Sequence, residues 1–190
     1  MAEYILASQS PRRKQLLEWA EIDFEIIVQP TDESFPHNLN PQEIAVHIAE
    51  QKALAVLQHR SDSQTVIAAD TIVVLDGKII GKPGSRSEAI NILSSLSGKQ
   101  HQVITGVVLK SKNKELSFSD VTEVEFHNLL PSQIEYYVDK YKPYDKAGAY
   151  AIQEWIGMIG VKCIRGDFYN VVGLPISRVV LALKEFESFK

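Results

Sequence analysis

ILASQSPRRKQLL, residues 5–17, is the stretch around which the chain is organised. The apolar residues at its start, preceded by Tyr4, are typical of a short buried strand. Ser10 and Pro11 then predict the start of a helix, because serine caps a helix N-terminus well and proline is tolerated at the first helical position. A strand that runs directly into a helix is therefore predicted here.

Two arginines, Arg12 and Arg13, fall in the first turn of this predicted helix, where acidic residues are the usual choice. The helix N-terminus favours anions through its unpaired amides and its dipole. Two guanidinium groups placed against that preference indicate a strongly anionic ligand, such as a phosphate chain. The alternative is that both arginines are solvated or pair with nearby carboxylates, and the spacing alone leaves both interpretations open.

The strongest strand pattern is VIAADTIVVL, residues 66–75, which is apolar on both sides of one polar pair. Aspartate is depleted from strands, and burying a carboxylate is costly unless it is paired, hydrogen-bonded or bound to a metal. Asp70 is therefore a candidate functional residue. The alternative is an aspartate at a bulge or strand end whose carboxylate accepts backbone N–H groups.

Other helices and strands are interleaved along the chain without strict alternation, which predicts an α/β fold with a mixed sheet. A capping box at Ser85 and Glu88 marks one helix start, and residues 166–175 are expected to form turns before a last amphipathic helix that carries Val179 and Phe186. Together with the last helix, the predicted helices are 11–20, 41–58, 86–96 and 131–141. The further predicted strands are 24–28, 78–81, 101–111, 117–127 and 157–165.

Two charged residues stand out between these elements. Lys52 falls on the apolar face of helix 41–58 and either extends to water or points into a polar cleft. Glu33 lies in the irregular loop 29–40, QPTDESFPHNLN, and such loops often carry functional residues.

Composition narrows the classes of protein. The 190 residues are enough for one domain or for two small lobes that share a core. With 24 acidic and 20 basic residues, the net charge of −4 gives no general attraction to nucleic acid or to an anionic membrane. The single cysteine, Cys163, lies in an apolar stretch, is expected in the core and fits a reducing compartment. Because no signal peptide or membrane span is apparent, we expect a cytoplasmic protein.

Several common motifs are missing. The chain has no P-loop, no GxGxxG after a strand and no GxSxG elbow. The five histidines form no close ligand pair, and each is predicted to lie at the surface. What remains is a set of cations and carboxylates that suits a polyphosphate with a hard divalent cation: Arg12, Arg13, Lys52, Lys82, Glu33 and Asp70.

Over essentially its whole length the chain resembles the Maf nucleotide pyrophosphatases. The resemblance lies in four motifs in the same order: ILASQSPRRKQLL (5–17), AADTIVVLDGKIIGKP (68–83), DKAGAYAIQ (145–153) and GDFYNVVGLP (166–175). It implies a single domain over residues 1–190, with an elongated mixed sheet flanked by helices and two lobes around a cleft, as in the inosine triphosphatase architecture. It also implies hydrolysis of nucleoside triphosphates to the monophosphate and pyrophosphate, with Mg²⁺ or Mn²⁺ as cofactor.

The resemblance also implies roles for individual residues. Asp70 matches the proton acceptor and, with Glu33, a plausible metal ligand. The AGAYAIQ motif is similar to the subgroup that acts on dTTP and UTP and differs from the 7-methyl-GTP subgroup, although Trp155 stands where small residues are common. The positions that match substrate-specificity residues are Arg12, Thr71 and Gln153, and those that match phosphate-binding residues are Ser8, Arg13, Lys52 and Lys82.

A nucleoside triphosphate is therefore the expected partner, and a homodimer is the expected assembly. The competing hypothesis is a nucleotide-binding regulator of cell division and septum formation with little catalysis. A nucleic-acid-binding module is disfavoured by the acidic balance and by the lack of a recognisable binding motif.

Overall fold

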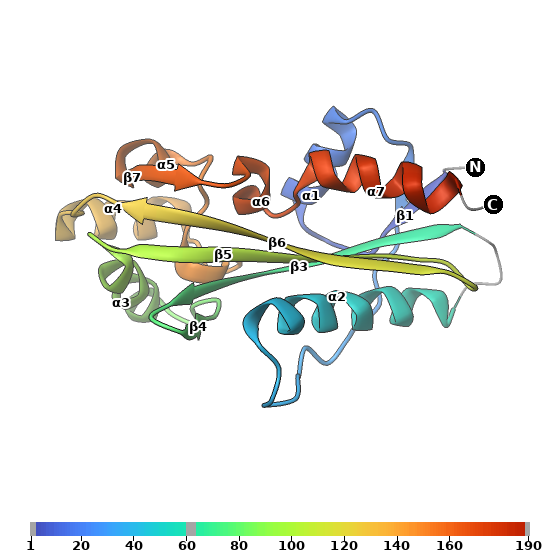
Figure 1. Cartoon of the computed structure of the whole chain (residues 1–190). Coiled ribbons are helices and arrows are strands. Elements are labelled where there is room, and N and C mark those ends of the chain that lie inside the picture. The colour runs from blue at the N-terminus through green and yellow to red at the C-terminus, as the bar shows by residue number, and fades with distance from the viewer. Residues whose placement is uncertain (1–2, 60–63, 189–190) are drawn as a thin grey trace. The chain divides into compact units, whose positions relative to one another are not determined.

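The computed structural model describes residues 3–59 and 64–188. The chain forms two compact units: unit 1 (Met1–Thr71, Thr105–Asp120 and Gly173–Lys190) and unit 2 (Ile72–Ile104 and Val121–Val172). Figure 1 shows the elements in order: β1 (Tyr4–Leu6), α1 (Pro11–Trp19), β2 (Phe24–Ile26), α2 (Pro41–Leu57), β3 (Thr65–Leu75), β4 (Lys78–Ile80), α3 (Arg86–Leu96), β5 (Gln100–Lys110), β6 (Glu115–Phe126), α4 (Pro131–Tyr141), η1 (Ala147–Ala149), α5 (Trp155–Gly160), β7 (Val161–Arg165), α6 (Phe168–Val172) and α7 (Ile176–Ser188).

The strands form a mixed sheet. Its hydrogen-bonded order is β2-β1-β3-β5-β6-β7, with β4 paired to β3 beside this path. Strand β1 is parallel to both β2 and β3, whereas β4 is antiparallel to β3 and β7 is antiparallel to β6. The predicted α/β fold with a mixed sheet flanked by helices is confirmed. The predicted cleft between two lobes concerns the arrangement of the units and stays a prediction.

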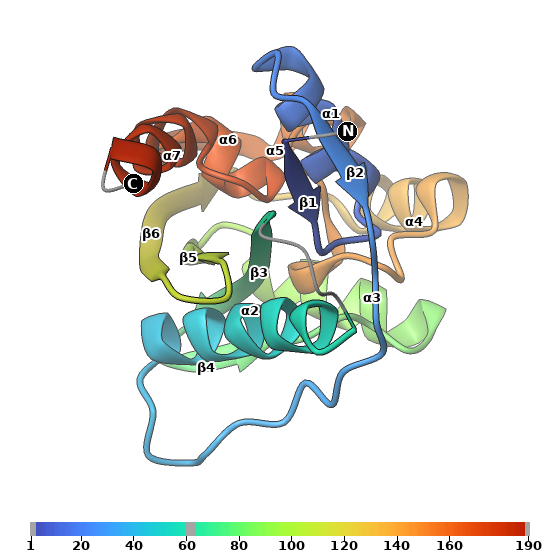
Figure 2. The same ribbon diagram turned by 90° about the vertical axis from the view of Figure 1, so that its right-hand side faces the viewer.

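Unit 1 holds both strand and helix of the ILASQSPRRKQLL motif. In Figures 1 and 2, α2 lies on one side of β3, and α1 and α7 lie on the other. Helix α2 begins with a full capping box, in which Asn40 and Glu43 exchange hydrogen bonds. Gly106 lets α2 approach β5 closely, because a Cβ atom there would lie 2.3 Å from the backbone of Val46. This close packing fixes the position of α2 over the sheet.

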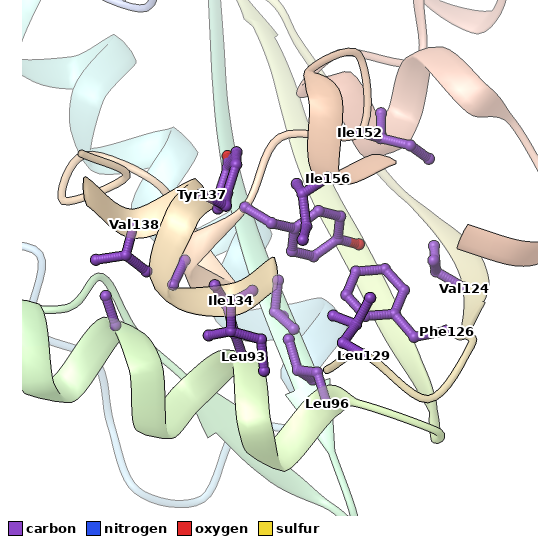
Figure 3. Packing of buried hydrophobic residues seen from close by; sticks show 14 of the residues in the cluster. Leu93, Leu96, Val124, Phe126, Leu129, Ile134, Tyr137, Val138, Ile152 and Ile156 are labelled. Carbon is purple, nitrogen blue, oxygen red and sulfur yellow. The ribbon is translucent and has the colours of Figure 1, made fainter. Parts of the chain in front are cut away.

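Unit 2 has its own hydrophobic core, drawn in Figure 3. Leu93 and Leu96 of α3 point toward Ile134 of α4, and Phe126 of β6 packs beside them. One face of strand β6 is buried, because its Thr122, Val124 and Phe126 are buried while the residues between them are more exposed. Burial of apolar side chains of this size stabilises a fold by roughly 1.5–3 kcal/mol each.

Four predictions from the sequence need correction. Residues 157–160 of the predicted strand 157–165 belong to α5, and only Val161–Arg165 is a strand, because an apolar run of this length fits either element. Residues 168–172 of the predicted turn region form α6. Ser85 caps α3 as predicted, but the Glu88 carboxylate accepts from the Gly84 N–H and completes no capping box. Cys163 is only partly buried.

The prediction that every histidine lies at the surface is wrong for His101, which is 2% exposed. Its Nε2 atom lies 2.8 Å from the Tyr150 hydroxyl, and its ring packs edge-on against Phe126. Its Nδ1 atom is buried and has no hydrogen-bond partner within residues 3–59 and 64–188. Burial without a nearby carboxylate lowers the pKa of His101 to about 4.

This histidine predicts a loss of stability in mild acid. In the unfolded chain His101 takes up a proton at pH ~6.5, whereas in the folded protein it does so only near pH 4. The free energy of unfolding is therefore highest above pH ~6.5 and decreases as the pH falls toward 4. The loss corresponds to about 3 kcal/mol in the free energy of unfolding. Urea unfolding at pH 7 and pH 4.5 would measure it. In His101→Gln the free energy of unfolding should change much less between these two pH values. In His127→Gln, a change at an exposed histidine, it should decrease as much as in the wild type. Equal losses in both variants would contradict the assignment.

In the part of the chain that the structure describes, every helix is too short or too polar to cross a membrane.

Candidate active site

The candidate site begins where β1 ends. Strand β1 pairs with β3 over Tyr4–Leu6, and the last pair joins Leu6 of β1 to Ile67 of β3. Strand β3 continues beyond this pair to Leu75. Residues 68–71 of β3 therefore extend beyond the carboxyl end of β1, and ligands of parallel sheets commonly bind at such ends. The chain leaves β1 through Ser8 and enters α1 at Ser10, whose hydroxyl caps the helix by accepting from the Arg13 N–H.

Arg13 is held rigidly inside unit 1. It is 8% exposed, and neutral oxygen atoms accept three hydrogen bonds from its guanidinium group. Nε donates to the Gly173 carbonyl at 2.8 Å, Nη1 donates to Ser8 Oγ at 3.2 Å, and Nη2 donates to Thr71 Oγ1 at 3.0 Å. Burial lowers the pKa of Arg13, and the negative charges of Asp70 and Glu33 oppose that effect. The guanidinium is therefore a fixed positive charge, and solvation, one of the alternatives for the two arginines, is wrong for Arg13.

Asp70 lies inside β3, three residues beyond the end of its pairing with β1. It is 9% exposed, and its Oδ1 atom is 2.6 Å from the Lys52 ammonium. The alternative interpretation, an aspartate at a strand end, is wrong, because β3 continues and the carboxylate meets a cation from α2. Lys52 thus points to a polar group and does not simply extend to water.

Glu33 reaches the same cation from the loop before α2. Its Oε1 atom lies 2.8 Å from Lys52 Nζ, and its side chain is 47% exposed. One ammonium thus joins two carboxylates, the first buried and the second accessible. The sequence predicted all three residues as site candidates, and the structure brings them together.

Successive side chains on a strand point to opposite faces. Asp70 accordingly meets Lys52 of α2, whereas Thr71 meets Arg13 of α1. Both contacts lie on the part of β3 that extends beyond β1. A ligand placed against this edge would face a carboxylate with its ammonium on one side and a buried guanidinium on the other.

Three more predicted site residues are more exposed than Arg13 and Asp70. Arg12 is half-buried on α1 in unit 1, while Lys82 and Gln153 are exposed residues of unit 2. Gln153 is flanked by an ionic cluster in which the buried Lys146 ammonium lies 2.8 Å from Asp145 and 3.6 Å from Glu154. The Tyr137 hydroxyl donates to Glu154 and accepts from the Ala151 N–H, so this cluster fixes the segment that carries Gln153.

Comparison with known proteins decides the family. Residues 3–186 match the family described as Maf-like protein. The chain belongs to this family. Maf-like relatives named dTTP/UTP pyrophosphatase include proteins of Bacteroides thetaiotaomicron (50% identity, 96% of this chain and 95% of the relative), Cytophaga hutchinsonii (50%, 96% and 84%) and Bacillus mycoides (48%, 99% and 97%). The Staphylococcus aureus Ham1 structure aligns with 65% of this chain and 71% of its own at 16% identity and a TM-score of 0.41, which does not bear on the fold.

The carboxylates of this Maf-like chain fit a hard divalent cation. Within residues 3–59 and 64–188, no three histidine, cysteine, aspartate or glutamate side chains gather into a complete cage for an ion. Magnesium is commonly held by one or two carboxylates together with substrate phosphates and water, so a complete protein cage is not required. Glu33 and Asp70 are the candidates for such a pair, because their carboxylates both lie within 2.8 Å of Lys52 Nζ.

Two residues that contact the site were not predicted from the sequence. Thr105 of β5 lies 2.9 Å from the Thr71 hydroxyl, and Gly173 supplies the carbonyl that binds Arg13. Thr105 carries the same signal as Asp70, since it is a polar residue inside an apolar strand. Gly173 lies in the GDFYNVVGLP motif, but a main-chain acceptor has no side-chain signature.

Proposed function

We propose that this chain is a nucleoside triphosphate pyrophosphatase that acts on dTTP and UTP. The observation that carries the proposal is the identity of about half of all residues, over 96% of the chain, with relatives named for that activity. The geometry of unit 1 supports it, because a buried carboxylate and fixed cations lie where a phosphate chain could be bound.

In the proposed reaction a water oxygen attacks the α-phosphorus. The bond from the α-phosphorus to the oxygen that bridges to the β-phosphorus breaks, and pyrophosphate leaves. The Asp70 carboxylate orients the water and accepts its proton. Lys52 holds this carboxylate at 2.6 Å, and Arg13 supplies a fixed charge to the phosphates. Glu33 and Asp70 would hold Mg²⁺ or Mn²⁺, and a bound cation of this kind would neutralise phosphate charge.

The other assignments are also part of the proposal. Ser8 orients Arg13 and Arg12 acts in substrate choice. Lys82 and Gln153 keep their predicted roles in phosphate binding and in recognition of the pyrimidine. A site that hydrogen-bonds the base of its substrate can reject other bases, because the wrong base leaves polar groups of the site unpaired. The cytoplasmic location and the homodimer stay predictions.

The test is pyrophosphate release from a panel of canonical nucleoside triphosphates and 7-methyl-GTP, measured with Mg²⁺ and with Mn²⁺. We expect release from dTTP and UTP at rates at least ~10-fold above those for the other nucleotides, a difference of about 1.4 kcal/mol in transition-state binding. Chelation of the metal should abolish it. Nucleotide binding without pyrophosphate release would instead favour a regulator, and release from every nucleotide alike would contradict the pyrimidine preference.

A further inference from the structure

Thr105 is a buried hydroxyl next to the candidate site. It lies on β5, in the stretch VITGVVL, and is 0% exposed. A buried hydroxyl is costly unless it is hydrogen-bonded. Its Oγ1 atom is 2.9 Å from Thr71 Oγ1 on β3, so the two strands are joined by a contact between side-chain hydroxyls.

The Thr71 hydroxyl is committed to neighbouring protein atoms. It accepts from Arg13 Nη2 at 3.0 Å, and it lies 2.9 Å from Thr105 Oγ1 and 3.4 Å from the Gly173 carbonyl oxygen. A hydroxyl has one proton and two lone pairs. If Thr105 donates to Thr71, the Thr71 proton is directed to Gly173; otherwise it is directed to Thr105. In both cases the proton is used inside this cluster.

Gly173 makes the second fixed point of the cluster. Its carbonyl accepts from Arg13 Nε at 2.8 Å, and its backbone has a φ angle of +133°, which L side chains rarely adopt. A chain of contacts therefore runs from Thr105 through Thr71 to Arg13. The Gly173 carbonyl contacts both Thr71 and Arg13. Thr71 and Gly173 thus bind the guanidinium directly, and Thr105 reaches it through Thr71.

We propose that Thr105 is a positioning residue for nucleotide hydrolysis, acting through Thr71 on the Arg13 guanidinium. The inference rests on the proposed function. It also changes the interpretation of Thr71: a hydroxyl committed to Arg13 influences substrate choice by setting the position of that cation and does not read the base directly.

The test compares Thr105→Val, which keeps the shape, with Thr105→Ser, which keeps the hydroxyl. We expect Thr105→Val to raise KM for dTTP and UTP about tenfold with kcat changed less than threefold, because Arg13 binds phosphate alike in the ground and transition states. Thr105→Ser should stay within about twofold of the wild type. Thr71→Val should match Thr105→Val, and the double variant should show no further rise in KM.

Val108→Ala is the matched control. Val108 is buried on the same strand and packs in the core around Ile5 and Ala49, away from Arg13. Its truncation should lower stability but leave KM unchanged, as any purely structural effect would. If Thr105→Val does not fold, Thr105→Ala takes its place with the same expected rise in KM. A wild-type KM in the folded valine or alanine variant overturns the proposal, as does a similar rise in the Val108→Ala control.

Calorimetric binding of inorganic pyrophosphate gives a readout that needs no turnover. Thr105→Val should weaken this binding about tenfold relative to the wild type, while Val108→Ala should not. If the wild type hydrolyses no nucleotide, the proposed function fails, and pyrophosphate affinity alone then decides the role of Thr105. Equal affinity in wild type and Thr105→Val overturns the inference, and so does a wild type that does not bind pyrophosphate.

Discussion

Pyrophosphate release by an Asp70→Asn variant is expected to fall about 10²- to 10⁴-fold, because the amide can no longer accept the proton of the attacking water. The variant should still fold, since the asparagine oxygen can accept the hydrogen bond that Lys52 donates at 2.6 Å. Nucleotide affinity should not weaken by the same factor, because the substitution removes a negative charge next to a polyphosphate. Single-turnover kinetics together with calorimetry on a non-hydrolysable dTTP analogue would separate the two effects.

The matched control is Asp76→Asn. Asp76 lies in the turn that follows the same strand, is well exposed, and pairs with Lys99 at 3.2 Å. Its φ angle of 50° is one that asparagine adopts readily, so the control makes the same chemical change without strain. It should retain wild-type turnover. Wild-type rates in Asp70→Asn would refute the proposed role of Asp70 as proton acceptor.

Glu33→Gln distinguishes proton transfer from metal binding. Glu33 and Asp70 both contact Lys52, but Glu33 is far more exposed and is proposed only as a metal ligand. Its variant should therefore need a higher metal concentration and regain turnover when that concentration is reached. Asp70→Asn should gain little from added metal.

Local sequence signals were enough to place most of the fold. The Ser10-Pro11 pair marked the start of α1, and the apolar run around Asp70 marked β3, because each signal involves only neighbouring residues. The signal was ambiguous at 155–160, where an apolar run fits strand and helix equally well. Hydrogen bonds from the Gly157 and Met158 N–H groups to the Glu154 carbonyl settle that stretch as a helix.

The candidate site shows a sharper limit. Arg12 and Arg13 carry the same local signal, yet Arg13 is buried and Arg12 is not. Arg13 differs because its side chain donates to the carbonyl of Gly173, 160 positions away in the sequence. No residue pattern within α1 could predict this contact. His101 was misplaced for the same reason, since its burial comes from packing against Phe126 and Tyr150.

Replacing Arg13 by lysine is expected to lower the free energy of unfolding by about 2–4 kcal/mol although the charge is kept. A single ammonium cannot reproduce the geometry by which the guanidinium donates to Ser8, Thr71 and the Gly173 carbonyl together. At least one buried acceptor would lose its partner, and the ammonium is harder to desolvate. At nucleotide concentrations below KM, pyrophosphate release should fall about 10²-fold as well, because KM rises when the charge is no longer held in one place.

Arg12→Lys makes the same substitution one residue earlier on the helix and serves as the control for stability. Because Arg12 is only half-buried, its replacement should change the free energy of unfolding by less than about 0.5 kcal/mol. Urea unfolding of the two variants would give the comparison. If Arg13→Lys were as stable as Arg12→Lys, the three hydrogen bonds would contribute little, and the guanidinium would be held by charge alone. A large loss confined to Arg13 would instead mean that its geometry links the N-terminal motif to Gly173.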